Sequence, residues 1–141
     1  MKRTETQAKT KPTLRESDLA HFYGGSETIY RHSISRAVCY TEGIQYLAEH
    51  GGAYWLLDAI AIFLLSTEMR EATKADPRVG SMHFWELTVK NESAKLTASA
   101  DSPVKPFFEQ AIPYTDFPLP EANIWAAWDG SRWVLMLPRE Y

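Results

Sequence analysis

The stretch Ala53–Ser66, AYWLLDAIAIFLLS, has one charged residue, Asp58, and all its other residues before Ser66 are apolar or aromatic. A membrane-spanning helix needs about 20 apolar residues, and polar residues flank this shorter run on both sides. Leucine, isoleucine and phenylalanine recur in it at helical spacings of three and four residues. The stretch therefore predicts a core helix that is covered on several sides.

The segments before this helix predict shorter elements. The string Thr13–Glu16 fits a capping box and predicts a short helix that reaches about Phe22. Ser26–Tyr40 is rich in β-branched and aromatic residues, which favours an extended segment with two short strands. Thr41 is placed to cap a second helix, and the glycine pair that begins at Gly51 is placed to end it.

From Met82 onward, apolar and polar residues alternate, which is the period of a β-strand. Short polar turns and prolines divide this half into a hairpin, a third strand and a last hairpin around Asp129 and Gly130. Helices followed by antiparallel strands predict an α+β fold. We expect the buried central helix and its flanking helices to pack on a four- or five-stranded antiparallel meander sheet.

The length of 141 residues is typical of one domain. Residues 1–12 are polar and aperiodic, so we predict a flexible N-terminal arm at 1–12 and a single α+β domain at 13–141. The formal charge of −3, from 15 basic and 18 acidic residues, disfavours a nucleic-acid partner. The basic arm keeps nucleic-acid binding as an alternative.

The single cysteine, Cys39, excludes an internal disulfide and is typical of a reducing cytoplasm. We expect a cytoplasmic protein, because no signal-peptide apolar run follows the basic start of the chain. Neither the cysteine nor the scattered histidines fit a metal-binding spacing, and no phosphate-binding or dinucleotide-binding glycine motif is present. The sequence predicts no metal, no cofactor and no membrane span.

Asp58 is the most informative candidate, because a carboxylate among apolar neighbours needs hydrogen-bond donors, a cleft or a raised pKa. We favour Asp58 as a buried structural acceptor that is paired with His32, Arg36 or a tyrosine. The alternative is that Asp58 is a functional carboxylate in a polar pocket with Tyr54, which lies four residues earlier on the helix. His32 is a candidate general base or anion ligand. No catalytic set is assigned, and the candidate binding residues are Glu27, Tyr30, Arg31, His32, Arg36, Tyr54 and Asp58.

Five strings of the chain carry a resemblance to a known family: FYGGSETIYRH, YTEGIQYLAEHGGAYWLLDAI, FWELTV, IPYTDFP and VLMLPREY. They resemble a family of small bacterial proteins, a domain of unknown function found in scattered genomes and mobile elements. The resemblance covers about Phe22 to Tyr141. It implies a cytoplasmic α+β domain, and it implies no reaction and no catalytic residues.

The aromatic content of 13% exceeds what a small core requires, and aromatic residues are enriched at protein interfaces. We therefore predict a non-enzymatic interaction or accessory protein, of bacterial or mobile-element origin, whose partner is another protein. The first alternative is a small hydrolase or ligand-binding domain with a pocket of His32, Arg36, Tyr54 and Asp58. The second is a nucleic-acid binder that uses the arm at residues 1–12.

Overall fold

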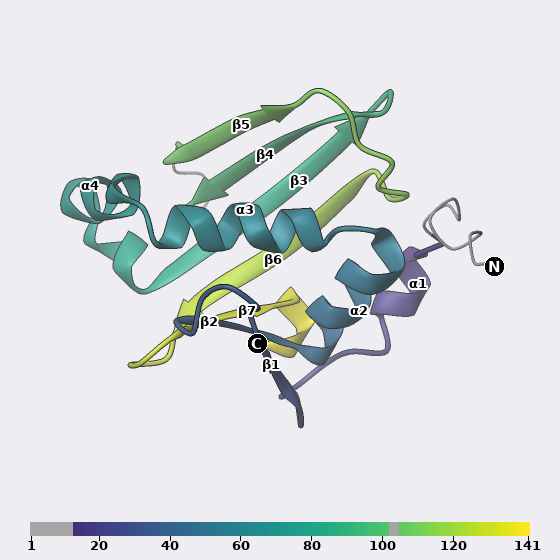
Figure 1. Cartoon of the computed structure of the whole chain (residues 1–141), viewed down its shortest axis with the longest axis horizontal. Helices are drawn as coiled ribbons and strands as arrows, with labels where there is room; N and C mark the ends of the chain where they lie inside the picture. The colour runs from purple at the N-terminus through teal and green to yellow at the C-terminus, as the bar shows by residue number, and fades with distance from the viewer. Residues whose placement is uncertain (1–12, 102–104) are drawn as a thin grey trace.

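The computed structural model describes residues 13–101 and 105–141, which form a seven-stranded sheet with helices packed against it (Figure 1). The arm predicted for residues 1–12 lies outside this described part. The helices are α1 (Glu16–Leu19), α2 (Glu42–Gly51), α3 (Tyr54–Leu64) and α4 (Thr67–Ala75), with 3₁₀ turns η2 (Pro77–Gly80) and η3 (Pro138–Glu140). The strands are β1 (Ile29–Arg31), β2 (Val38–Thr41), β3 (Met82–Lys90), β4 (Ser93–Ser99), β5 (Phe108–Ile112), β6 (Glu121–Trp128) and β7 (Trp133–Met136).

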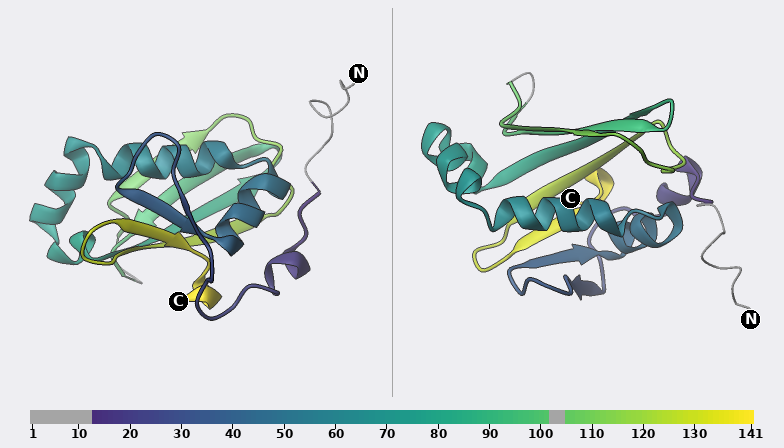
Figure 2. Two further views of the ribbon diagram at one scale, coloured as in Figure 1. Left: turned by 60° about the horizontal axis from the view of Figure 1, so that its bottom comes forward. Right: turned by 45° about the horizontal axis from the view of Figure 1, so that its top comes forward.

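The central helix lies across the sheet, as predicted (Figure 1). Leu57 and Ile60 are buried, and Phe63 packs edge-on against Trp85 of β3 with ring centroids 5.7 Å apart. The expectation that this helix is covered on several sides is wrong, because its side turned away from the sheet is exposed. Within the described residues, the sheet lies on one side of α3, and the helices α2 and α4 lie beyond the two ends of α3 (Figure 2).

The sheet corrects the predicted meander in size and in order. Its strand order is β1-β2-β7-β6-β3-β4-β5, so β6 pairs with β3 instead of with β5. Between β5 and β6 the chain crosses back through a proline-rich connection, residues 113–120, to the side of β3 opposite β4. β5 is left as an edge strand, which its flanking prolines predicted.

The two predicted N-terminal strands join this sheet and make it mixed. β1 pairs antiparallel with β2, and β2 pairs parallel with β7, with Cys39 opposite Val134. Helices followed by alternating strands along the chain predicted an antiparallel sheet. That prediction did not include the two N-terminal strands in the sheet. The parallel pair forms between segments that are nearly 100 residues apart in sequence, and no local pattern encodes such a pair.

The capping box predicted at Thr13 is absent. α1 begins after Arg15, whose N–H donates to the Asp18 carboxylate at 3.0 Å. The N–H groups of Thr13 and Leu14 instead bond to the carbonyl of His50 at the end of α2, and Leu14 is buried. Burial of Leu14 against α2 fixes the chain here, so tertiary packing overrides the local capping signal.

The start of α2 joins three distant parts of the chain. The N–H of Glu42 donates to Ser26 Oγ at 3.1 Å, the N–H of Gly43 donates to Glu140 Oε2 at 3.1 Å, and the N–H of Ile44 donates to Thr41 Oγ1 at 3.3 Å. The first three free amides of the helix thus all have side-chain acceptors. The predicted cap at Thr41 is confirmed. We call Ser26, Thr41, Gly43 and Glu140 the α2 junction.

Glu140 closes this junction with both of its carboxylate oxygens. Oε1 accepts from Thr41 Oγ1 at 2.5 Å and from the Leu137 N–H at 2.9 Å, and the side chain is buried. A Cβ on Gly43 would lie 2.7 Å from Glu140 Oε1, so glycine is needed for this close approach. Three of the strings that carry the family resemblance therefore meet in one structural contact.

Candidate functional site

His32 follows β1 and organises the loop that leads to β2. Its Nδ1 accepts the N–H groups of Ile34 and Ser35 at 3.2 and 3.3 Å, and its own N–H donates to the carbonyl of Val38 at 2.9 Å. The ring is buried beneath this loop. A histidine that accepts two amides at Nδ1 carries its proton on Nε2 when neutral.

Nε2 of His32 lies 2.8 Å from Oδ1 of Asp58 on α3. The Asp58 side chain is 49% exposed, so the expected pairing with His32 is confirmed, whereas the expected burial is wrong. The β1–β2 loop comes up beside α3 at this contact, as the left view of Figure 2 shows. One oxygen of Asp58 therefore fixes the loop to the helix, and no described residue donates a hydrogen bond to the other oxygen.

This geometry limits the chemistry that His32 can perform. A general base needs a free nitrogen lone pair within reach of substrate. In His32, Nδ1 is occupied by two backbone amides and Nε2 donates to the carboxylate. Because both nitrogens are engaged, the His32–Asp58 pair acts as a fixed clasp between the β1–β2 loop and α3.

Tyrosines extend from this pair over the same side of the sheet. Tyr30 of β1 stacks on Tyr40 of β2, with ring centroids 5.7 Å apart. Burial, followed by the nearby Tyr30 and Asp58, raises the pKa of Tyr40. Tyr54 donates its hydroxyl to Glu49 at 2.9 Å; partial burial and then this hydrogen bond raise the pKa of Tyr54 to about 12. The phenols of Tyr40 and Tyr54 therefore remain protonated at neutral pH.

The other three predicted site residues do not join this group. Arg31 is opposite Cys39 in the β1–β2 register and so points to the other face of the sheet from its neighbours Tyr30 and His32. Glu27 lies before β1 and Arg36 lies after it, and both are exposed. Neither makes a hydrogen bond or ion pair within the described residues. The structure thus brings together His32 and Asp58, with Tyr30 and Tyr54 nearby.

Exposed aliphatic side chains lie around the clasp. Ile34, next to His32 in the loop, is 78% exposed, Ile62 is 67% exposed and Leu65 is 58% exposed. Tyr54, Asp58, Ile62 and Leu65 follow helical spacing and share the side of α3 that faces away from the sheet. We call this exposed side of α3, together with Ile34 of the loop that His32 joins to it, the α3 face. Sequence reasoning missed Ile62 and Leu65 because it predicted that the helix is covered on several sides, and it did not single out Ile34 within the extended segment.

Cys39 and His83 are buried groups without a role at the α3 face. Burial raises the pKa of the Cys39 thiol, which disfavours the reactive thiolate. His83 is enclosed by aromatic rings, and its Nε2 donates to the carbonyl of Val79 at 2.6 Å. Burial lowers the pKa of His83 to about 4, so this histidine is neutral near pH 7.

Two further properties of residues 13–101 and 105–141 bear on function. No three of their histidine, cysteine, aspartate and glutamate side chains are grouped so that they could hold a metal ion. Within the same residues, no helix combines the length and the apolar character needed to cross a bilayer.

Fold and site together define a small mixed α/β domain in which a His–Asp clasp supports an exposed apolar helix face. The chain belongs to the family described as Family of unknown function (DUF6876), whose model matches residues 13–141. No curated protein and no solved structure matches the chain.

Proposed function

We propose that this chain is a protein-binding domain and that its partner docks on the α3 face. The observation that carries this proposal is the exposure of Ile34, Ile62 and Leu65 around one half-exposed carboxylate. Single exposed aliphatic residues are ordinary, whereas several together on one surface are typical of interaction sites. The clasp supports the proposal further, because it holds loop and helix in a fixed arrangement before a partner arrives.

The α3 face also indicates the chemistry of the partner. The second oxygen of Asp58 accepts no hydrogen bond from a described residue, and the Glu49 carboxylate lies beside Tyr54. A partner that covers the aliphatic residues must therefore supply a donor to Asp58, and an arginine or lysine meets that need best. We propose a different protein with an apolar surface and a central basic side chain. The resemblance adds the expectation of an accessory role in bacteria or their mobile elements.

Site-specific crosslinking tests this assignment. A benzophenone amino acid is placed at position 34 or 62, and at position 86 as a control, because Glu86 is exposed on the opposite face of the sheet. In cells that naturally contain the chain, positions 34 and 62 are expected to capture the same protein, which position 86 does not capture. Capture of the same protein from all three positions would contradict the proposed surface.

Binding measurements with the purified partner complete the test. Ile62→Asp is expected to weaken binding at least about tenfold, the effect of about 1.4 kcal/mol, because it buries an unpaired charge at the interface. Glu86→Ala is the matched control. Unfolding midpoints of both variants should stay near that of the unchanged chain. Equal affinities for the Ile62→Asp variant and the control, or self-association of the chain through this face, would refute the proposal.

The alternative of a hydrolase loses support because both nitrogens of its candidate base, His32, are engaged. Ligand binding at the clasp remains the distinct rival. Small-molecule binding that Ile62→Asp leaves intact but Asp58→Asn removes would favour this rival over protein docking.

A further inference from the structure

Strand β7 is shorter than its neighbour β6. On its β6 side, β7 pairs with Trp125–Trp128 alone, beginning at Trp125 opposite Met136, and the chain then turns into η3. Extending this register by two residues would place Asn123 opposite Pro138, which has no N–H to donate. Among the described residues, the first half of β6 therefore has β3 on one side and no strand on the other.

The alternation of an antiparallel pair shows which backbone groups face this open side. The carbonyl of Pro120 accepts a hydrogen bond from the N–H of Val89, and the N–H of Trp128 donates to the carbonyl of Ser81. The backbone N–H and C=O groups of the even-numbered residues of β6 therefore point toward β3. The N–H and C=O groups of Glu121 and Asn123 consequently point to the open side. None of them bonds to another described residue there.

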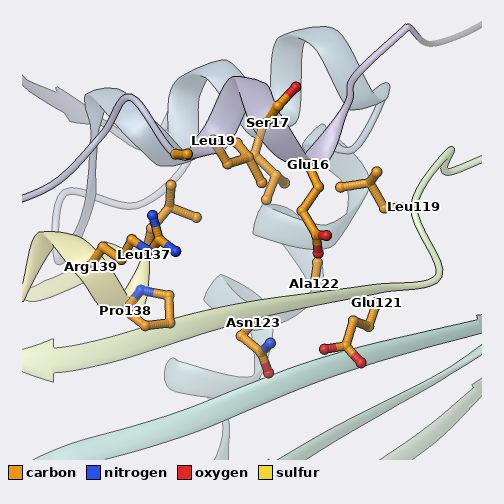
Figure 3. A pocket seen from close by; sticks show the side chains of 12 residues that line it. Glu16, Ser17, Leu19, Leu119, Glu121, Ala122, Asn123, Leu137, Pro138 and Arg139 are labelled. Carbon is orange, nitrogen blue, oxygen red and sulfur yellow. The ribbon is translucent and has the colours of Figure 1, made fainter.

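A pocket of about 520 Å³ lies along this open edge (Figure 3). α1 forms the opposite wall and η3 forms one end. Its lining is mixed: charged and polar side chains alternate with the buried apolar side chains of Leu47, Leu119, Ala122 and Leu137. We call this space the β6 groove. Its volume is in the range of small binding sites, and its position beside unpaired strand edges distinguishes it from a simple surface hollow.

The charges in the β6 groove are separated along its length. Figure 3 shows Glu16 reaching from α1 toward β6 near Glu121, whereas Arg139 lies at the η3 end. None of these three side chains makes an ion pair with a described residue. β6 runs from Glu121 toward η3, so the acidic end of the groove is beside the start of this strand segment.

We propose that the β6 groove binds a short extended peptide of another protein, which adds as a strand beside Glu121–Ile124. Main-chain hydrogen bonds to an exposed strand edge provide affinity, and alternate side chains enter the adjacent pocket. The charge separation sets which end of the peptide lies at which end of the groove. The peptide binds with a basic residue or its amino end near Glu16 and Glu121 and an acidic residue or its carboxyl end near Arg139. This site is separate from the α3 face and does not depend on it.

Nuclear magnetic resonance titration with designed peptides tests this inference on the full chain. The probe is Lys-Val-Val-Val-Glu, and the matched control is Glu-Val-Val-Val-Glu, both with blocked ends. The probe is expected to shift the backbone amide signals of Glu121 and Asn123 and to slow hydrogen exchange at these amides. The control peptide should bind at least about tenfold more weakly, because in either direction one of its glutamates meets Glu16 and Glu121.

Two further changes separate strand addition from other binding. A probe with N-methylated central valines should lose at least about tenfold in affinity, because methylation removes the N–H groups that pair with β6. Glu121→Lys should weaken the unmodified probe similarly, whereas Glu109→Lys on the distant edge strand β5 should not. No shift at Glu121 and Asn123 at millimolar probe would overturn the proposal. Equal binding of the methylated probe would also overturn it, and would identify a pocket for compact amphipathic molecules.

Discussion

Two carboxylates, Glu140 and Asp58, each join segments that are distant in sequence, but they do so in different ways. Glu140 is buried, and its two oxygens accept three hydrogen bonds at the α2 junction. Asp58 is half exposed, and one of its oxygens accepts from His32 while the other has no donor among the described residues. A fully satisfied buried group stabilises the fold, whereas a partly satisfied exposed group keeps capacity for a partner.

The largest expected effect is at the α2 junction. Glu140→Ala leaves the Thr41 hydroxyl and the Gly43 and Leu137 amides without their acceptor. Each buried unsatisfied donor costs about 1–3 kcal/mol, so the free energy of unfolding should fall by at least about 3 kcal/mol. Urea unfolding measures this change. Glu86→Ala, at an exposed position, should stay within about 0.5 kcal/mol of the unchanged chain.

If the Glu140→Ala variant unfolds at the same urea concentration as the Glu86→Ala control, the junction is not held by its carboxylate. Gly43→Ala gives an independent check on the same contact. Its new Cβ would collide with Glu140 and Leu137, so this substitution should also destabilise the fold.

His83 is a buried group that must remain neutral in the folded chain. The pKa of His83 is lowered from 6.5 to about 4, so between these pH values the unfolded chain binds more protons than the folded chain. The stability that His83 contributes is present above pH 6.5 and is lost as pH falls toward 4. The shift corresponds to about 3 kcal/mol.

Urea unfolding measured at intervals from pH 7 to pH 4 checks this prediction. His83→Gln removes the titrating group and should flatten the decline in unfolding free energy over that range. An equally steep decline in the variant would assign the pH dependence to the carboxylates instead.

The smallest expected effects concern Asp58. Asp58→Ala removes the acceptor of the His32 Nε2 proton and should cost about 1–3 kcal/mol. Asp58→Asn keeps an acceptor oxygen and should change the free energy of unfolding by less than about 1 kcal/mol, while removing the negative charge offered to a partner. Denaturant unfolding, together with affinity for the captured partner, distinguishes the two roles. A strong loss of stability in the Asp58→Asn variant would place Asp58 with Glu140 as a purely structural group.

The sequence by itself determined most of the elements. The period of apolar residues predicted α3 and the later strands, Thr41 and the glycines bounded α2, and Asp129-Gly130 marked the last hairpin. These signals are local: each depends on helical or strand periodicity, on a side chain that bonds a nearby amide, or on a backbone angle that glycine allows. They required no knowledge of the rest of the chain.

Only the tertiary structure decided how these elements meet. The parallel pairing of β2 with β7, the return of β6 to β3 and the role of Glu140 at the start of α2 all join residues far apart in sequence. The candidate site follows the same division. Asp58 was identified from its apolar neighbours, but its pairing with His32 instead of Arg36 depended on which loop came to lie beside α3. The exposure of Ile62 was not predictable either, because an apolar residue has the same pattern whether protein or solvent lies beyond it.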